Sequence, residues 1–305
     1  MANLKQLAKK GDLLTGGHRA CVGCGATIIA RQVLAATETP VVCSISTGCL
    51  EVVSTLYPFN AWQVPFIHNA FENSAATISG IEACYRALKR RGKIDREIKF
   101  IGWGGDGGTY DIGIQALSGA VEREHDFLFI CYDNQAYMNT GIQRSSATPL
   151  GAHTTTSPAG SVIPGKIQNR KDLTEIMIAH DIPYAAQASP GHWNDLATKV
   201  RKALNTPGAT FINILSPCQL GWRHEPSETI EIARIAVDTC FWPLYEVENG
   251  NYKITKKPKK KLPISAFLEN QGRFRHLMKP ENKKVVEELQ AFVDRKWELL
   301  LERAT

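Results

Sequence analysis

Two polar residues, Asp106 and Asn134, follow apolar segments of the sequence at positions where they could share a metal ion. Asp106 lies at the centre of the glycine-rich run GGDGG at 104–108, and Asn134 directly follows the run FLFICYD at 127–133. A glycine backbone can approach phosphate oxygens closely, and carboxylate and amide oxygens are hard ligands that suit Mg²⁺. These residues predict a site for Mg²⁺ and a diphosphate. The alternative is a glycine-rich turn in which Asp106 caps a helix.

The segments around these residues predict one βαβ unit. The apolar runs 98–103 and 127–132 are expected to be buried parallel strands, and 110–124 carries apolar side chains that suit a crossover helix. A right-handed crossover brings the carboxyl ends of both strands to one edge of the sheet, where open α/β sheets bind ligands. Asp106 and Asn134 are therefore expected to face one cation.

This arrangement resembles the signature of thiamine-diphosphate enzymes, in which Gly-Asp-Gly is followed one βαβ unit later by Asn. The segment DNQAYMNTG at 133–141 favours this interpretation over a simple turn. The resemblance implies that Mg²⁺ is held by Asp106, Asn134 and the backbone carbonyl of Ala136. The implied cofactor-binding residues are Gly105, Asp106, Gly107, Gly108, Asn134, Ala136 and Asn139.

The chain contains eight cysteines, and their surroundings divide them into two groups. Four lie in apolar or helical contexts and are expected to be buried small hydrophobic residues without a function: Cys43, Cys84, Cys131 and Cys240. The other four lie beside Gly or Pro in loop-like sequence and are expected to be ligands: Cys21, Cys24, Cys49 and Cys218.

A C-x-x-C pair with two remote cysteines could bind zinc, hold a 4Fe-4S cluster or form a thiol-disulfide couple. Structural zinc usually recruits two close pairs. Here Cys49 and Cys218 are single residues from separate loops, an arrangement that a cluster tolerates better. The residues alone place a cluster modestly ahead of zinc.

Seven segments resemble, in this order, the β subunit of the 2-oxoacid:ferredoxin oxidoreductases that act on pyruvate: GHRACVGCGA, STGCLEV, YPFNAWQVPFIHNAFENSAAT, GWGGDGGTYDIG, YDNQAYMNTGIQRSSATP, TTTSPAG and SPCQLGW. The resemblance implies that Cys21, Cys24, Cys49 and Cys218 hold the 4Fe-4S cluster nearest thiamine diphosphate. It also places Asn139 near the reacting carbon, as a catalytic residue.

The activity implied by this resemblance is oxidative decarboxylation of pyruvate, dependent on coenzyme A, with ferredoxin as the electron acceptor. Relatives acting on oxalate, 2-oxoglutarate or a branched 2-oxoacid are the alternatives within the family. A non-catalytic zinc-binding scaffold is the alternative from another class. The chain resembles the diphosphate-binding half of a site, so an α subunit is expected to supply the pyrimidine-side domain and the activating Glu. Further expected partners are γ and ferredoxin-like δ subunits or domains.

The composition and the order of the predicted elements favour a doubly wound α/β fold with a parallel sheet, of the diphosphate-binding type, and a C-terminal extension. We expect residues 1–220 to form the cofactor-binding domain, and 221–305 to form an extension with a basic loop at 256–261 and a terminal amphipathic helix. The net charge of +6 comes with no nucleic-acid motif, which predicts that the chain does not bind nucleic acid. The N-terminal stretch 1–17 lacks an apolar core of signal-peptide length, and no run suits a membrane span. These features predict a soluble cytoplasmic protein.

Overall fold

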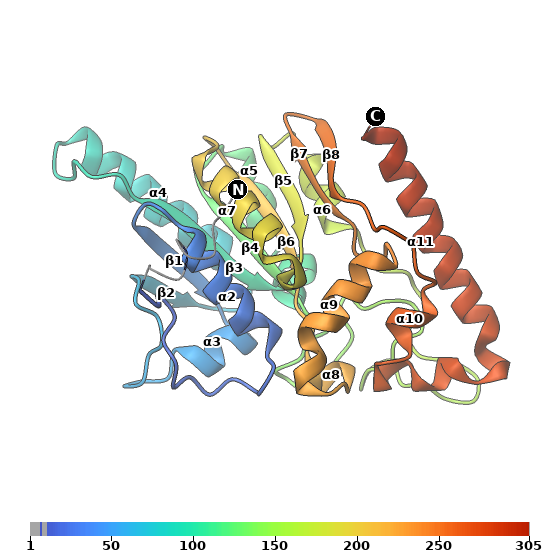
Figure 1. The fold of residues 1–305 in the computed structure, drawn as a ribbon. Helices are drawn as coiled ribbons and strands as arrows, with labels where there is room; N and C mark the ends of the chain where they lie inside the picture. The colour runs from blue at the N-terminus through green and yellow to red at the C-terminus, as the bar shows by residue number, and fades with distance from the viewer. Residues whose placement is uncertain (1–6, 8–10, 305) are drawn as a thin grey trace.

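The computed structural model describes residue 7 and residues 11–304, so most of the first ten residues of the predicted N-terminal stretch lie outside the described part. Its strands are β1 (Val41–Ser46), β2 (Phe66–Asn69), β3 (Lys99–Gly105), β4 (Leu128–Asp133), β5 (Tyr184–Ala188), β6 (Thr210–Leu215), β7 (Leu244–Glu248) and β8 (Asn251–Lys256). They form one sheet in the order β2-β1-β3-β4-β6-β5-β7-β8 (Figure 1). The first six strands in this order are parallel, and β7 and β8 pair antiparallel at one edge.

Helices cover both faces of the sheet, as a doubly wound fold requires. One face packs against α2 (Gly25–Ala36) and α7 (Trp193–Asn205), and the other against α4 (Ser74–Arg90), α5 (Ile114–Glu122) and α6 (Leu173–Ile178). The central strand β4 is buried along its whole length because Leu128 and Ile130 join the first core while Phe129 and Cys131 join the second. A strand buried on both faces favours a continuous apolar run over an alternating one. The predicted fold class is confirmed.

The strand order reverses between β1 and β3, and this reversal selects the place for a ligand. From β1 the chain adds β2 on one side and then returns to add β3 on the other. Ligands of open α/β sheets bind outside the carboxyl ends of the strands at such a switch point. Gly48 and Cys49 follow β1, and Asp106 follows β3, so the predicted site residues meet there.

The C-terminal part of the chain completes the same sheet. Strands β7 and β8 extend it beyond β5, and α9 (Thr229–Asp238), α10 (Ser265–Leu268) and α11 (Lys283–Arg303) form a third core with Trp222 and Phe274. The terminal helix α11 lies beside β8, at the end of the sheet opposite β2 (Figure 1). The division of the chain at residue 220 stays a prediction, and the structure adds that residues on both sides of it share one sheet.

Several predicted elements differ from those observed. The helix expected over 110–124 is divided into a π-helical segment, η1 (Gly107–Ile112), and α5. Strands β2, β7 and β8 were not predicted. The prediction that Cys84 is buried is wrong: it lies on an exposed face of α4, whereas Cys43, Cys131 and Cys240 are buried. None of the helices formed by the described residues has the length and hydropathy needed to cross a membrane.

Candidate active site

Two cavities open at the carboxyl ends of the parallel strands. The glycine-loop cavity has a volume of about 280 Å³, and its lining includes Thr47, Gly48, Cys49, Gly105, Asp106, Gly107, Gly108, Tyr132, Asn134, Ala136, Met138 and Asn139. The four-cysteine cavity has a volume of about 290 Å³, and its lining includes Cys21, Cys24, Cys49, Cys218, Asn134, Met138 and Asn139. Every residue that the sequence predicted for cofactor or metal binding lines at least one of these cavities.

Oxygen atoms of Asp106, Asn134 and Ala136 converge in the glycine-loop cavity. One terminal atom of the Asn134 amide lies 2.8 Å from the carbonyl oxygen of Ala136 and 2.8 Å from Oδ1 of Asp106. In the metal-free chain this position suits the amide nitrogen, which would donate to both oxygens. With Mg²⁺ it suits the amide oxygen, since ligands about 2.0–2.1 Å from an octahedral Mg²⁺ lie roughly 2.9 Å from one another. The residues present therefore fit a Mg²⁺ ion.

Asp106 is held in place from two sides. Its carboxylate accepts hydrogen bonds from the backbone N–H of Asn134 at 3.2 Å and from Oγ of Ser145 at 2.5 Å. Burial and the charge of Asp133 raise the pKa of Asp106 well above its usual range, and the bond from Ser145 opposes that rise. A bound cation would favour the ionised form of the same carboxylate.

The loop after β3 can approach an anion because its glycines leave room. A side chain at Gly107 is excluded, since a Cβ atom there would lie 2.5 Å from the ring of Tyr137. Tyr132 also lines this cavity, and among the described residues its buried hydroxyl has only the backbone N–H of Leu50 nearby, which leaves its own proton without an acceptor. A buried hydroxyl usually has a partner. A diphosphate oxygen would fit that need.

The four predicted ligand cysteines come from three separate segments. Cys21 lies in a loop, Cys24 precedes α2, Cys49 is the first residue of α3 (Cys49–Ser54), and Cys218 precedes α8 (Gln219–Trp222). All four are free thiols. The buried cysteines Cys43, Cys131 and Cys240 do not line this cavity. Gly25 lets α2 approach the loop of Cys218, because a Cβ atom there would lie 2.6 Å from the carbonyl oxygen of Pro217.

The four cysteines line one cavity, as the ligands of a cluster with several metal atoms would. Within residues 7 and 11–304, no three Cys, His, Asp or Glu side chains converge on one ion position. In a 4Fe-4S cluster each cysteine binds a different iron atom, so the thiolates surround a cavity and need no common point. Burial and the neighbouring cysteines raise the pKa of Cys49 to about 12, and metal binding would displace its proton.

The two cavities share one wall. Cys49, Asn134, Met138 and Asn139 line both of them. Three of these residues belong to one segment, 134–139. Two non-glycine residues in or near this segment have a positive φ angle: Gln135 with φ 68° and Ile142 with φ 64°. A β-branched residue rarely adopts this conformation, and such strain clusters at functional sites.

A buried ionic network, which the sequence did not predict, lies behind Asn134. Asp133 is fully buried and accepts hydrogen bonds from Arg170 at 2.5 Å and from Tyr110 at 2.6 Å. Asn213 donates to the Tyr110 hydroxyl at 2.7 Å. The network holds the residue directly before a predicted metal ligand. In the sequence, the only sign of this network is the acidic residue Asp133 beside Asn134. Its partners Tyr110 and Arg170 come from distant segments, so the sequence does not show that they meet.

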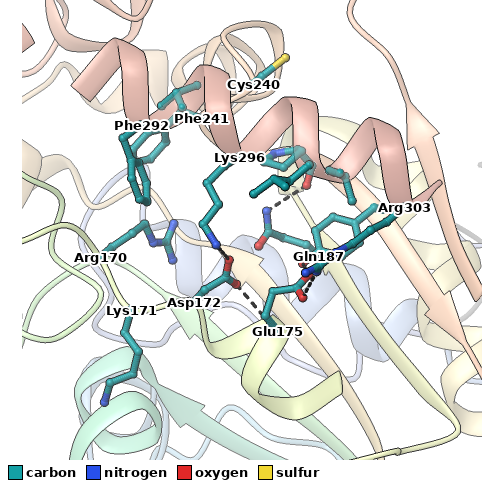
Figure 2. A pocket seen from close by; sticks show the side chains of 15 residues that line it. Arg170, Lys171, Asp172, Glu175, Gln187, Cys240, Phe241, Phe292, Lys296 and Arg303 are labelled. Atoms are coloured by element: carbon teal, nitrogen blue, oxygen red, sulfur yellow. Dashed lines mark hydrogen bonds and ion pairs between the residues drawn. The ribbon is translucent and has the colours of Figure 1, made fainter. Parts of the chain in front are cut away.

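Arg170 also lines a third cavity, of about 210 Å³, between α6 and the terminal helix α11 (Figure 2). Charged side chains in this cavity pair with one another: Lys296 lies 3.0 Å from Asp172, and Arg303 lies 2.5 Å from Glu175. The pairs fasten α11 to the body of the domain. We assign the chemistry to the other two cavities, which hold the glycine loop and the cysteines.

Residues 46–214, more than half of the chain, match the family described as the thiamine pyrophosphate enzyme C-terminal TPP-binding domain. The chain is 52% identical to the pyruvate synthase subunit PorB of Thermotoga maritima, over 98% of this chain and 95% of that protein. It is 48% identical to the ketoisovalerate oxidoreductase subunit VorB of Pyrococcus abyssi, over 93% of this chain and 91% of that protein. A 2-oxoglutarate:ferredoxin oxidoreductase structure from Magnetococcus marinus matches with a TM-score of 0.55 at 20% identity, covering 73% of this chain and 79% of that one, which shows the fold alone.

The fold and the glycine loop define the class of this chain: it carries the thiamine-diphosphate-binding domain of thiamine-diphosphate enzymes. Within that class, the chain belongs to the family of 2-oxoacid:ferredoxin oxidoreductase β subunits that contains PorB and VorB. The family predicted from the seven sequence segments is thereby confirmed.

Proposed function

We propose that this chain is the β subunit of a pyruvate:ferredoxin oxidoreductase and that its two cavities hold thiamine diphosphate with Mg²⁺ and a 4Fe-4S cluster. The observation that carries the proposal is the wall shared by the two cavities. A cofactor that leaves electrons on a substrate carbon would then lie next to an acceptor of single electrons. A decarboxylase without electron transfer has no need of the four cysteines.

The glycine-loop cavity would hold the diphosphate through Mg²⁺. Oδ1 of Asp106, the amide oxygen of Asn134 and the carbonyl oxygen of Ala136 would hold the ion, and the backbone at Gly107 would approach the phosphate oxygens. Thiamine diphosphate, when bound, supplies the carbanion that attacks a 2-oxo carbon and permits loss of CO₂. Asn139, on the shared wall, would donate a hydrogen bond to the 2-oxo oxygen.

The four-cysteine cavity would hold the cluster through the thiolates of Cys21, Cys24, Cys49 and Cys218. A 4Fe-4S cluster, when bound, accepts and releases one electron at a time. Cys49 belongs to both cavities, so the chain itself would hold the donor and the acceptor of electrons side by side. Ferredoxin would receive the electrons at the end of the route.

The rest of the active site would come from partner chains. The relatives are named as subunits, which supports a complex of several chains. Glu51, two residues after Cys49, lines neither cavity, and its carboxylate accepts a hydrogen bond at 2.7 Å from Thr55, the residue that caps α3. We therefore assign the activating Glu to an α subunit with the pyrimidine-side domain. Coenzyme A would accept the acyl group, and γ and ferredoxin-like δ subunits would carry electrons onward.

The identity of the substrate, pyruvate, is the most specific part of the proposal. It is supported by the relative named pyruvate synthase, at 52% identity, but a relative named ketoisovalerate oxidoreductase follows at 48%. The group beyond the carbonyl distinguishes these substrates, and none of the residues assigned above reads that group. A branched 2-oxoacid is thus the second candidate substrate.

The test is to purify the complex anaerobically, to measure iron, zinc and thiamine diphosphate, and to follow ferredoxin reduction with several 2-oxoacids. We expect a brown protein with absorbance near about 400 nm, as Cys-ligated iron-sulfur centres give. We also expect the highest kcat/KM with pyruvate. A colourless protein with stoichiometric zinc would mean a scaffold subunit. A higher kcat/KM with a branched substrate would contradict the choice of pyruvate alone.

A further inference from the structure

Arg273, from the C-terminal part of the chain, is a buried cation without an acidic partner. Only 2% of its surface is exposed, and no ion pair in the described part of the chain includes it. Its guanidinium donates to the side-chain oxygens of Gln271 at 2.9 Å and Gln135 at 2.7 Å, both neutral groups. Arg170, a partly buried arginine near the site, has Asp133 at 2.5 Å.

A buried charge is costly unless an opposite charge compensates it. Burial lowers the pKa of Arg273, and negative charge at Cys218, Asp133 and Asp106 opposes that change. Asp133 already serves Arg170. Asp106 is assigned above to Mg²⁺, so the anionic group that remains in this direction is the set of thiolates around Cys218.

Contacts of Arg273 connect it to both cavities. Its guanidinium lies 3.9 Å from the ring centre of Trp222, the last residue of α8, and Cys218 caps the start of this short helix. The indole N–H of Trp222 donates to the backbone carbonyl of Asn134 at 2.8 Å. Arg273 is therefore fixed behind the shared wall, next to the elements that carry a cluster ligand and a metal ligand.

We propose that Arg273 is the fixed counter-charge of the cluster and raises its reduction potential. This inference rests on the function proposed above, because it requires a cluster on the four cysteines. Reduction adds one negative charge to the cluster, and a cation held nearby stabilises the more negative state. At an effective dielectric constant of about 20, a unit charge on the order of 10 Å away changes a one-electron equilibrium roughly tenfold.

The experiment compares three variants of the chain in its complex: Arg273→Gln, Arg273→Lys and Arg275→Gln. Arg275 is the matched control, since it lies two residues away in the same segment and is exposed. The readout is the midpoint potential from a redox titration followed by electron paramagnetic resonance, on the signal that Cys49→Ser abolishes. We expect Arg273→Gln to weaken reduction about tenfold, which equals about 59 mV for one electron. Arg273→Lys should shift the potential much less, and Arg275→Gln should leave it unchanged.

An unchanged potential in Arg273→Gln, with the cluster present, would overturn the proposal. An equal shift in Arg273→Lys would also overturn it, because that variant keeps the charge. If Arg273→Gln loses iron while Arg273→Lys retains it, the need for a positive charge is supported. If both variants lose iron, the shape of the arginine side chain is required and not its charge, which would overturn the proposal. A wild-type protein without the iron-sulfur signal would contradict the proposed function itself, before any variant is compared.

Discussion

Replacing Ser145 by Ala tests whether Asp106 is a metal ligand held in position by its neighbours. The Ser145 hydroxyl donates to the carboxylate of Asp106 at 2.5 Å, and both side chains are 1% exposed. A hydrogen bond to a charged group contributes about 1.5–3 kcal/mol. Loss of such a partner of a metal ligand typically weakens metal binding by about 10- to 100-fold, because the ligand is no longer oriented. We expect Ser145→Ala to weaken the binding of Mg²⁺ by that factor.

The assay is a titration of Mg²⁺ in the presence of thiamine diphosphate, with retention of the cofactor after gel filtration as the readout. The matched control is Ser146→Ala, since Ser146 follows directly and its side chain makes no bond to Asp106. Circular dichroism and iron content report whether each variant folds as the wild type does. A Ser145→Ala variant with the Mg²⁺ dependence of the wild type would refute the reasoning, and so would an equal loss in Ser146→Ala.

Three further predictions concern the two cavities. Asp106→Ala should lose thiamine diphosphate and Mg²⁺ but keep its iron, as measured by metal and cofactor analysis; retention of both would contradict the assignment of the glycine loop. Cys49→Ser should lose iron while Cys43→Ser keeps it, since Cys49 lines the four-cysteine cavity and Cys43 does not; the reverse result would mean that the cysteines are assigned wrongly. The purified chain should not reduce ferredoxin with pyruvate until an α subunit is added. Turnover by the chain alone would contradict the inference that this chain forms only half of the active site.

The inner parallel strands could be predicted from the sequence because they are buried on both faces. The apolar runs 98–103 and 127–132, predicted as strands, overlap the observed β3 and β4. Strand β2, at the parallel edge of the sheet, is partly exposed and was not predicted. Strands β7 and β8 at the edge were not predicted. Strand β8 alternates between exposed and partly buried residues, and several of its residues are lysine or threonine, so it lacks the continuous apolar run of the inner strands.

The residues of the candidate site could be predicted because they lie in short motifs near strand ends. Asp106 and Asn134 stand beside apolar runs, and the cysteines stand beside Gly or Pro. Their supporting partners could not be predicted in this way. Arg170 and Arg273 reach the site from distant segments, and an arginine in a sequence is more often an exposed residue than a buried one. Only the packing of the whole chain shows that Arg273 is buried and Arg170 partly buried.

The covalent connection between the two cavities has a consequence for electron transfer. Asn134, a predicted Mg²⁺ ligand, and Asn139, on the wall of the cysteine cavity, are five residues apart in one segment, which Trp222 anchors through the backbone of Asn134. The distance between the two cofactors would therefore be set inside this chain, and docking of a partner would leave it unchanged. A partner subunit would complete the chemistry at the thiamine ring, whereas the first electron-transfer step would depend on the packing of Trp222 and its neighbours. Variants of the subunit interface should consequently alter decarboxylation more than the spacing of the two cofactors.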